Sequence, residues 1–331
     1  MKLLKGLLIS FILSLAPWHA HAAEKVNVAV ASVSTNFATI YVAKAKDYFN
    51  EVGLDVTIQD VGKGSNVVAS LVGGSVDIAG LGIANLAATV KGGQPLKAFA
   101  TATRGAPSFL VVGKAFQKSR PLKFDASFEE RVRALKGATI AVNDIGGSAG
   151  DFVRDILRRA GMSESDVTMI NISSGPGRLA TLKAGKIDAV IGYTPEPETA
   201  KLEGYGDIFI RSDKDIPESL RVEYIVWVAP EKTISEKPEM IKKFAKGLEM
   251  AATLMRDHPD DARNAYFSEI RKKSNSSAVD AESEALQWEN MRPFFAIPTK
   301  LDAAAVKAAW EYFHLPKEVT QGQMIDYSVS N

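Results

Sequence analysis

The sequence predicts an α/β protein with two similar lobes, a hinge that the chain crosses twice, and a mostly helical C-terminal segment. Three observations predict this architecture. Short runs rich in β-branched residues alternate with helical patterns, as in βαβ units. Residues 73–82 (GGSVDIAGLG) are echoed by residues 184–193 (AGKIDAVIGY), each a glycine-ended helix followed by an apolar strand. After residue 230 helical patterns dominate, with no further clear strand.

The first lobe begins with a strand and a long helix. Apolar side chains between residues 41 and 52 recur at three- and four-residue steps, and Gly53 supplies the C-terminal stop. Ser34, Thr35 and Asn36 are the N-cap candidates. We therefore expect one continuous helix here. The strand patterns of this lobe cover residues 26–32, 55–61, 77–82 and 97–103.

The second lobe repeats the alternation. A helix over residues 148–160 places its apolar side chains on one face and three arginines elsewhere, and Gly161 ends it. This pattern predicts a helix that lies on a sheet. The strand patterns of this lobe cover residues 108–113, 139–144, 167–173 and 188–194.

The C-terminal segment comes after a strand pattern at residues 224–230. If the chain leaves the first lobe near Arg104 and returns near Tyr224, two crossings join the lobes and a cleft lies between them. We assign residues 23–105 and 226–331 to lobe 1 and residues 106–225 to lobe 2. Trp310 and Phe313 share one face of the last helix, so we expect them in the core. Helices are predicted over residues 239–256, 260–271, 278–290 and 302–313.

The N-terminus has the pattern of a secretory leader. Lys2 and Lys5 precede an uncharged run over residues 7–16, and an Ala-His-Ala sequence ends at Ala22. The run is well short of the roughly 20 residues that span a bilayer as a helix. We expect residues 1–22 to be a signal peptide cut after Ala22, and the mature protein to be periplasmic.

Composition excludes several classes of function. The 40 basic and 39 acidic residues give a formal charge of +1, so no basic excess exists to bind nucleic acid. Without cysteine the chain cannot form disulfides or Cys-ligated metal sites. The mature chain has only His258 and His314, which make no metal-binding motif, so we expect no metal and no cofactor.

Several segments together carry a family resemblance. The most specific feature is the YF-x-E-x-GLDV motif followed by a VDIA strand that ends in glycine. The segments follow one another in the family's order along most of the mature chain; they are residues 45–58, 62–82, 104–112, 135–162 and 184–197. The sequence resembles the nitrate/sulfonate/taurine class of ABC-transporter solute-binding proteins. The resemblance implies a type II periplasmic binding protein fold, a small-molecule ligand, an inner-membrane ABC permease as partner, and no catalysis. It also implies that the helical tail packs mainly on lobe 1. We expect a monomer.

The ligand site is expected where strands end. In open α/β sheets, ligands bind beyond the carboxyl ends of the strands, where helix N-termini present unpaired N–H groups. In the alternative interpretation, the serines there only cap helices, and Asp151 already complements one helix dipole. The candidates are Ser34, Thr35, Asn36, Ser65, Gly82 and Ile83 in lobe 1, and Gly147, Ser148 and Ala149 in lobe 2.

Four further side chains discriminate between ligand classes. Arg104 and Arg178 are able to clamp an oxyanion, or else are solvated or paired with acids. Tyr193 is able to stack on a ring and Glu196 to accept from an amine or a heterocyclic N–H; Glu196 alternatively caps a helix near Pro195. The leading interpretation is a small organic anion such as a sulfonate, nitrate or taurine; the alternative is a nitrogen heterocycle such as a thiamine-pathway pyrimidine. Substitution of Ser148 or Arg178 should weaken binding with little loss of fold.

Enzyme interpretations have some support in motifs. Residues 146–150 satisfy G-x-S-x-G between a strand and a helix, so a serine esterase using Ser148 is a distant alternative, although no HGGG-type motif precedes it. Residues 175–180 fit a relaxed dinucleotide fingerprint, but a proline lies between its glycines. The pyrimidine synthases related to this fold depend on a cysteine-rich segment, which the sequence lacks.

Overall fold

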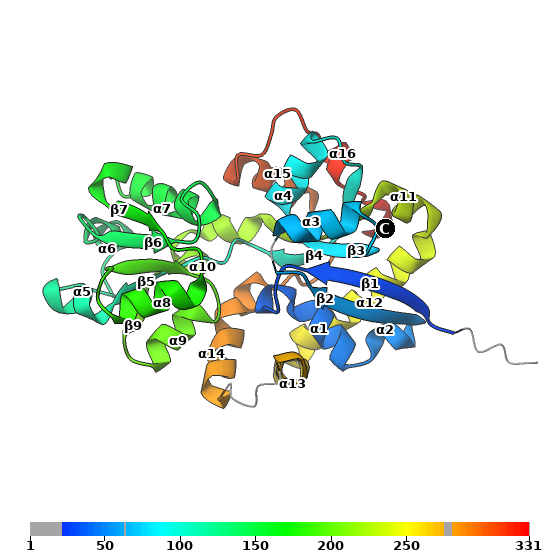
Figure 1. The fold of residues 1–331 in the computed structure, drawn as a ribbon, viewed down its shortest axis with the longest axis horizontal. Coiled ribbons are helices and arrows are strands. Elements are labelled where there is room, and N and C mark those ends of the chain that lie inside the picture. The colour runs from blue at the N-terminus through cyan, green and yellow to red at the C-terminus, as the bar shows by residue number, and fades with distance from the viewer. Residues whose placement is uncertain (1–21, 63, 275–279, 331) are drawn as a thin grey trace, which may run out of the picture.

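The computed structural model describes residues 22–62, 64–274 and 280–330, which form two five-stranded sheets side by side (Figure 1). The first sheet has the order β2-β1-β3-β10-β4. Its β1, β2 and β3 are parallel, and β10 runs antiparallel to both of its neighbours. Its strands are β1 (Glu24–Val30), β2 (Leu54–Asp60), β3 (Ile78–Gly82), β4 (Leu96–Arg104) and β10 (Glu223–Pro230).

The second sheet has the equivalent topology, β7-β6-β8-β5-β9, with β5 antiparallel to both neighbours. No strand pattern predicts β9, which begins with Gly206 and Asp207. Every other strand agrees with its sequence pattern to within about three residues at each end. The strands are β5 (Phe109–Gly113), β6 (Thr139–Val142), β7 (Thr168–Asn171), β8 (Ala189–Gly192) and β9 (Gly206–Arg211).

The internal sequence echo has a structural cause. The carboxylate of Asp77, just before β3, accepts a hydrogen bond from the backbone N–H of Asn27 on β1 at 3.0 Å. The carboxylate of Asp188, just before β8, accepts one from the backbone N–H of Thr139 on β6 at 2.8 Å. The aspartate of each echoed segment thus fixes the same strand pair in its own lobe.

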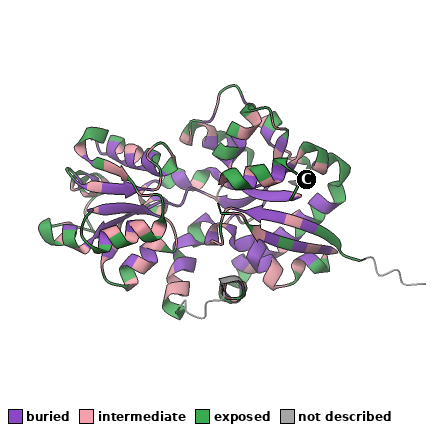
Figure 2. Cartoon of the chain, in the orientation of Figure 1, coloured by how far each residue is buried: buried purple, intermediate pink, exposed green. Residues whose placement is uncertain are grey.

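Helices cover both faces of each sheet, and the strands between them are mostly buried (Figure 2). On β10, Trp227 packs on one face of the first sheet, and Val226 and Val228 pack on the other, as the two-residue period of a strand requires. The face with Trp227 carries α1 (Ala38–Ala45), α2 (Tyr48–Glu51), α12 (Pro238–Asp257) and α13 (Pro259–Ser274). The other face carries α3 (Gly64–Val72), α4 (Ile83–Lys91), α15 (Ala303–Tyr312) and α16 (Gln321–Met324). The short α11 (Glu231–Glu236) comes directly after β10.

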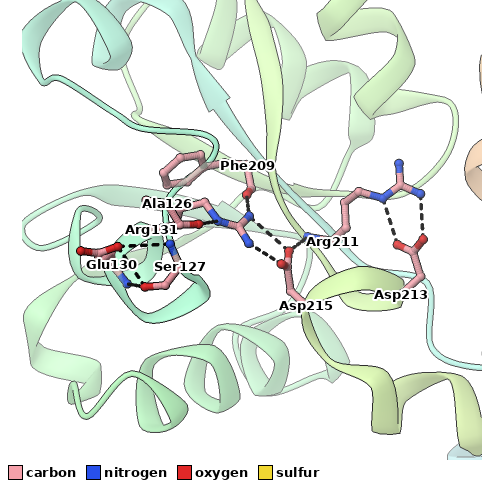
Figure 3. A network of polar contacts seen from close by, with 8 residues as sticks. All are labelled: Ala126, Ser127, Glu130, Arg131, Phe209, Arg211, Asp213 and Asp215. Carbon is pink, nitrogen blue, oxygen red and sulfur yellow. Dashed lines mark hydrogen bonds and ion pairs between the residues drawn. The ribbon is translucent and has the colours of Figure 1, made fainter.

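The second lobe carries α5 (Lys114–Ser119), α6 (Phe128–Arg133) and α7 (Ser148–Arg159) on one face, and α8 (Gly175–Lys183) and α9 (Glu196–Leu202) on the other. Ser127 and Glu130 form a capping box at the start of α6. From α6, Arg131 reaches the backbone carbonyl of Phe209 on β9 and the carboxylate of Asp215 (Figure 3). Asp215 also accepts from the backbone N–H of Arg211 at 2.7 Å, so α6 holds the end of β9.

The first predicted helix is interrupted in the structure. A 3-10 turn, η1 (Thr35–Phe37), precedes α1, and α1 is separated from α2 at Asp47, whose φ is +63°. Asp47 tolerates this left-handed conformation because its carboxylate accepts from the Asn50 side chain at 2.5 Å. Lys46 beside it pairs with Asp261 on α13 at 2.7 Å. The apolar spacing predicts the buried face correctly but not the break.

Two chain segments connect the sheets, from β4 to β5 and from β9 to β10. The second contains α10 (Ser212–Asp215) and the 3-10 turn η3 (Pro217–Arg221). The segments bind each other: the N–H of Gly105 donates to the Val222 carbonyl at 2.7 Å, and the buried Ser212 hydroxyl donates to the Ala106 carbonyl at 2.8 Å. These two crossing segments lie where the sequence predicts the hinge, but the predicted boundary between residues 225 and 226 falls inside β10, whose first residues Glu223–Ile225 thus belong to the first sheet.

The tail helices α12, α13 and α15 end close to their predicted bounds. The start of the predicted helix over residues 278–290 lies outside the described residues; its described part is α14 (Ala281–Met291), which leads into the 3-10 turn η4 (Arg292–Phe294). Unlike its neighbours, α14 contacts lobe 2, where Asn290 binds Glu198 and Arg211 and Phe294 meets Phe109. Residues 1–21 of the predicted leader, which covers residues 1–22, also lie outside the described residues. Within that part, no helix is long and apolar enough to cross a membrane.

Candidate functional site

A cavity of about 730 Å³ lies between α7 of lobe 2 and the end of α15 in lobe 1. Residues of both crossing segments, including Ala106, Ser108 and Val222, also line it. Its volume is in the range of small-molecule sites. Because both lobes and both crossing segments form its walls, any rotation of one lobe against the other changes its shape.

Ser148 is the sequence-predicted residue that lines this cavity. It occupies the first position of α7, after the N-cap Gly147, and no side chain caps this helix end. Its hydroxyl hydrogen-bonds the phenol of Tyr193, which comes after β8. Burial raises the pKa of the Tyr193 phenol, and the bond with Ser148 opposes that rise. The Ser148 side chain therefore does not cap the N-terminus of α7.

The glycines around Ser148 are needed for packing. A Cβ at Gly150 would lie 2.0 Å from the carbonyl oxygen of Ile145, which no side chain tolerates. A Cβ at Gly147 would lie 3.1 Å from a carboxylate oxygen of Asp144, whose other oxygen accepts from the N–H of Gly146 at 3.0 Å. The G-x-S-x-G match thus has a local structural reason, the tight turn into α7. Ala149 is buried in the core of this lobe.

An aromatic wall forms the lobe 1 side of the cavity. Tyr224 on β10 and Phe313 after α15 have ring centroids 5.9 Å apart, and Tyr312 meets Phe313 edge-on at 4.9 Å. Burial raises the pKa of Tyr224, and it raises the pKa of Tyr312 to about 12. The helical spacing of Trp310 and Phe313 predicts core packing. Both pack partly on the core, and Phe313 also faces the cavity.

Arg178 and Glu196 bind each other. The guanidinium donates to both carboxylate oxygens, at 2.6 and 3.3 Å, and to the carbonyls of Ile172 and Ser173. Arg178 is 3% exposed. Burial raises the pKa of Glu196, whereas the charge of Arg178 lowers it. A Cβ at Gly175, the first residue of α8, would lie 2.4 Å from Glu196, so this carboxylate already occupies that helix N-terminus.

This geometry changes two expectations. Arg178 was expected to bind ligand directly and to be replaceable with little loss of fold, but its donors contact the chain itself and its charge is buried with a partner. Glu196 is half-buried and paired rather than a surface cap. The dinucleotide fingerprint at residues 175–180 forms the N-terminal end of α8. The Glu196 carboxylate occupies the position at this helix end where a phosphate would bind.

Arg104, at the end of β4, is likewise paired. It donates to a carboxylate oxygen of Glu223 at 3.0 Å and to the Lys300 carbonyl at 2.7 Å. Glu223 is fully buried, and burial raises its pKa against the lowering effect of Arg104. The pair joins β4 to β10 beside the crossing segments.

The first-lobe candidates lie beyond the carboxyl ends of β1 and β3, except Ser65, which comes after β2. Ser34 precedes η1 without a side-chain cap bond, and its Oγ is buried with no hydrogen-bond partner among the described residues. The same holds for Oδ1 of Asn36. Thr35 is buried, Gly82 is the N-cap of α4 without a side-chain cap, and Ile83 packs in the core. Ser65 is exposed on α3.

A second cavity, of about 450 Å³, lies on lobe 2 against α14. Lys114, Lys201 and Asp207 contribute charge to it, and Glu198 and Asn290 lie at its edge. None of the predicted site residues lines it. Within the described ranges, no group of three or more His, Asp or Glu side chains is placed to share a metal ion.

Residues 34–262 match the family described as NMT1/THI5 like. The chain belongs to this family. It is 23% identical over 324 residues to a putative binding protein, YtlA, of Bacillus subtilis strain 168, with 92% of this chain and 89% of the relative covered.

Solved structures share the fold. The periplasmic aliphatic sulphonate binding protein SsuA of Escherichia coli matches with a TM-score of 0.70 at 16% identity, over 91% of this chain and 97% of that one. The alkanesulfonate-binding SsuA of Xanthomonas axonopodis pv. citri, bound to MOPS, matches with a TM-score of 0.67 at 18% identity, over 92% and 99%. These matches confirm the periplasmic binding protein fold.

Proposed function

We propose that this protein is a non-catalytic, periplasmic receptor that captures a small organic anion between its lobes and delivers it, as a monomer, to an ABC permease. The observation that carries the proposal is the 730 Å³ cavity, because both lobes and both crossing segments line it. The names of two matched structures, a periplasmic aliphatic sulphonate binding protein and an alkanesulfonate-binding protein, point the same way.

The anion is favoured by the end of α7. Its first N–H groups lack a side-chain cap, and Ser148 adds a hydroxyl at the cavity wall. Dipoles of this kind solvate an oxyanion without burying a full counter-charge. Arg178 and Glu196 do not contact the cavity, but both lie close enough to interact electrostatically with Tyr193, the partner of Ser148. We assign the pair a positioning role.

Capture results from differential affinity. A ligand bound to one lobe favours closure only by the extra contacts that the other lobe makes in the closed state. Here α7 supplies contacts from lobe 2, and Tyr224 and Tyr312 supply them from lobe 1. The crossing segments flex between the two states.

The other interpretations have less support. A heterocycle would be held by Tyr193 and Glu196, but neither residue lines the cavity, and Glu196 is paired with Arg178. An esterase needs a base on Ser148; His314 lines the same cavity, but the hydrogen-bond partner of the Ser148 hydroxyl is Tyr193. Turnover of a chromogenic ester that disappears in Ser148→Ala would contradict the non-catalytic proposal.

The test is a thermal-shift panel of sulfonates, nitrate, aromatic carboxylates and pyrimidines. A ligand at a hundred times its Kd stabilises the folded state by about 2.7 kcal/mol, which raises the melting temperature by several degrees. We expect an organic anion to give the largest rise, and Ser148→Ala to reduce it. Ser235→Ala, at an exposed serine on α11 outside the cavity, is the matched control. A pyrimidine giving the largest rise, or no compound giving one, contradicts the proposal.

A further inference from the structure

The cavity between the lobes is too large for the smallest anions. Water occupies about 30 Å³ per molecule in the liquid, so 730 Å³ corresponds to roughly two dozen waters. A nitrate ion or a two-carbon sulfonate would leave most of that volume filled with water. A ligand that excludes this water needs a larger apolar body.

The walls of the cavity show the shape of that body. Tyr224, Phe313 and Tyr312 form a continuous row of half-buried rings on the lobe 1 side. Phe152 on α7 lines the cavity from lobe 2. Facing aromatic surfaces favour a flat ring between them, through stacked or edge-on contacts worth about 0.5–1.5 kcal/mol each beyond area burial. A ring placed here contacts both lobes at once.

The charges around the cavity supply one free cation among the described residues. Arg154 pairs with Asp151 at 2.9 Å, and Arg158 and Arg159 both pair with Asp155. Arg221, in the second crossing segment, also lines the cavity and forms no ion pair with any described residue. Glu311, on the α15 side, likewise pairs with no cation in the described part of the chain. An acidic ligand is therefore attracted to Arg221 and directed away from Glu311.

We infer that the ligand is an aromatic acid, with its ring against Tyr224, Phe313 and Tyr312 and its sulfonate or carboxylate between Ser148, at the start of α7, and Arg221, which line the same cavity. This inference rests on the proposed capture of an organic anion and narrows its substrate class. Arg221 and Phe313 then determine specificity, because one selects the acid group and the other selects the ring.

The experiment is calorimetric titration with benzenesulfonate, benzoate, ethanesulfonate, taurine and benzamide. We expect benzenesulfonate or benzoate to bind at least about tenfold more tightly than ethanesulfonate or taurine. Phe313→Leu and Tyr312→Leu should each remove most of that preference while leaving ethanesulfonate affinity within about twofold. Phe124→Leu, an exposed ring outside this cavity, should change neither. Circular dichroism and melting curves verify that each variant folds.

The charge is tested separately. Arg221→Gln should weaken benzenesulfonate by about tenfold and leave neutral benzamide unchanged, whereas Glu311→Gln should not weaken benzenesulfonate. If ethanesulfonate or taurine binds as tightly as the aromatic acids, the inference of an aromatic ligand is wrong, but the proposed function as a receptor for an organic anion is not contradicted. Binding of benzamide alone, or of none of the five compounds, overturns both.

Discussion

Asn290 on α14 donates a hydrogen bond from its side-chain amide to Glu198 on α9 at 2.5 Å, and its amide oxygen accepts one from Arg211 at 2.6 Å. Both partners belong to lobe 2, whereas α14 also carries Trp288 in the lobe 1 core. The helix is therefore a third connection between the lobes, besides the two crossing segments.

Replacing Asn290 with alanine should destabilise the fold, because it removes one of the two donors to a buried carboxylate oxygen of Glu198 and leaves a guanidinium N–H of Arg211 without its acceptor. Unsatisfied buried groups of this kind cost about 1–3 kcal/mol. Urea denaturation measures the change. Asn171→Ala, at an exposed position on β7, is the control and should lie within about 0.5 kcal/mol of the parent. Equal stability of Asn290→Ala and the control would show that the α14 contact contributes nothing.

Glu198 should make stability depend on pH. It is 1% exposed, and burial raises its pKa above the ordinary glutamate value of 4.5, with Asn290 and Thr194 opposing the rise. The folded state therefore holds the proton more tightly than the unfolded state, and this contribution is complete below pH 4.5 and lost as the pH rises through the folded pKa. Glu198→Gln keeps the shape and removes the titration.

Denaturation curves from about pH 4 to about pH 8 test this expectation. Stability of the parent should fall relative to Glu198→Gln across that range. Glu203→Gln, on an exposed acid just after α9, should track the parent. A parent and Glu198→Gln with parallel pH profiles would show that the carboxyl does not titrate differently in the folded state.

The pair of Arg178 and Glu196 should behave as one unit. Arg178→Met leaves Glu196 buried without its counter-charge and should cost about 3–5 kcal/mol. Arg178→Met combined with Glu196→Gln should recover a large part of that loss, because no buried charge then stands alone. A double-mutant cycle in urea measures the coupling. Additive effects of the two single substitutions would contradict the pairing.

Gly105 in the first crossing segment has φ of +84°, and a Cβ there would lie 2.9 Å from Phe294 and 3.1 Å from the backbone of Leu220. Gly204 has φ of +73° with nothing within 4 Å. Alanine at either position meets the left-handed backbone cost of about 1–2 kcal/mol. Only Gly105→Ala adds a clash, so it should be clearly the less stable variant. Equal losses of stability in the two variants would show that the crossing segments accommodate a Cβ at residue 105 without a clash.

The two sheets could be predicted from the sequence because most of their strands are short runs rich in β-branched and other apolar residues. The lobe repeat could be predicted because Asp77 and Asp188 make the same contact in each lobe. The edge strand β9 could not be predicted in this way, nor could the break at Asp47, which depends on a local carboxylate contact. Hydrophobic periodicity reports which face is buried, not where such contacts interrupt a helix.

The candidate site was harder to predict. Ser148 and Tyr193 come after strands, so their positions marked them as candidates, and the structure joins them. Arg104 and Arg178 also lie at or beyond strand ends, but a sequence does not show that a distant glutamate will take their donors. Tyr224 and Phe313 lie inside elements that look like core, and only the meeting of the lobes brings them to a cavity.

The most direct test of lobe closure is the distance between the lobes with and without ligand. Because the chain has no cysteine, Ser165→Cys in lobe 2 and Lys307→Cys on α15 give two unique spin-label sites, both exposed and outside the cavity. Double electron–electron resonance is measured with the anion that raises the melting temperature most. We predict that saturating ligand changes the mean distance between the two spin labels and narrows the distribution of that distance. Distance distributions that are identical with and without tightly bound ligand would contradict closure of the lobes around it.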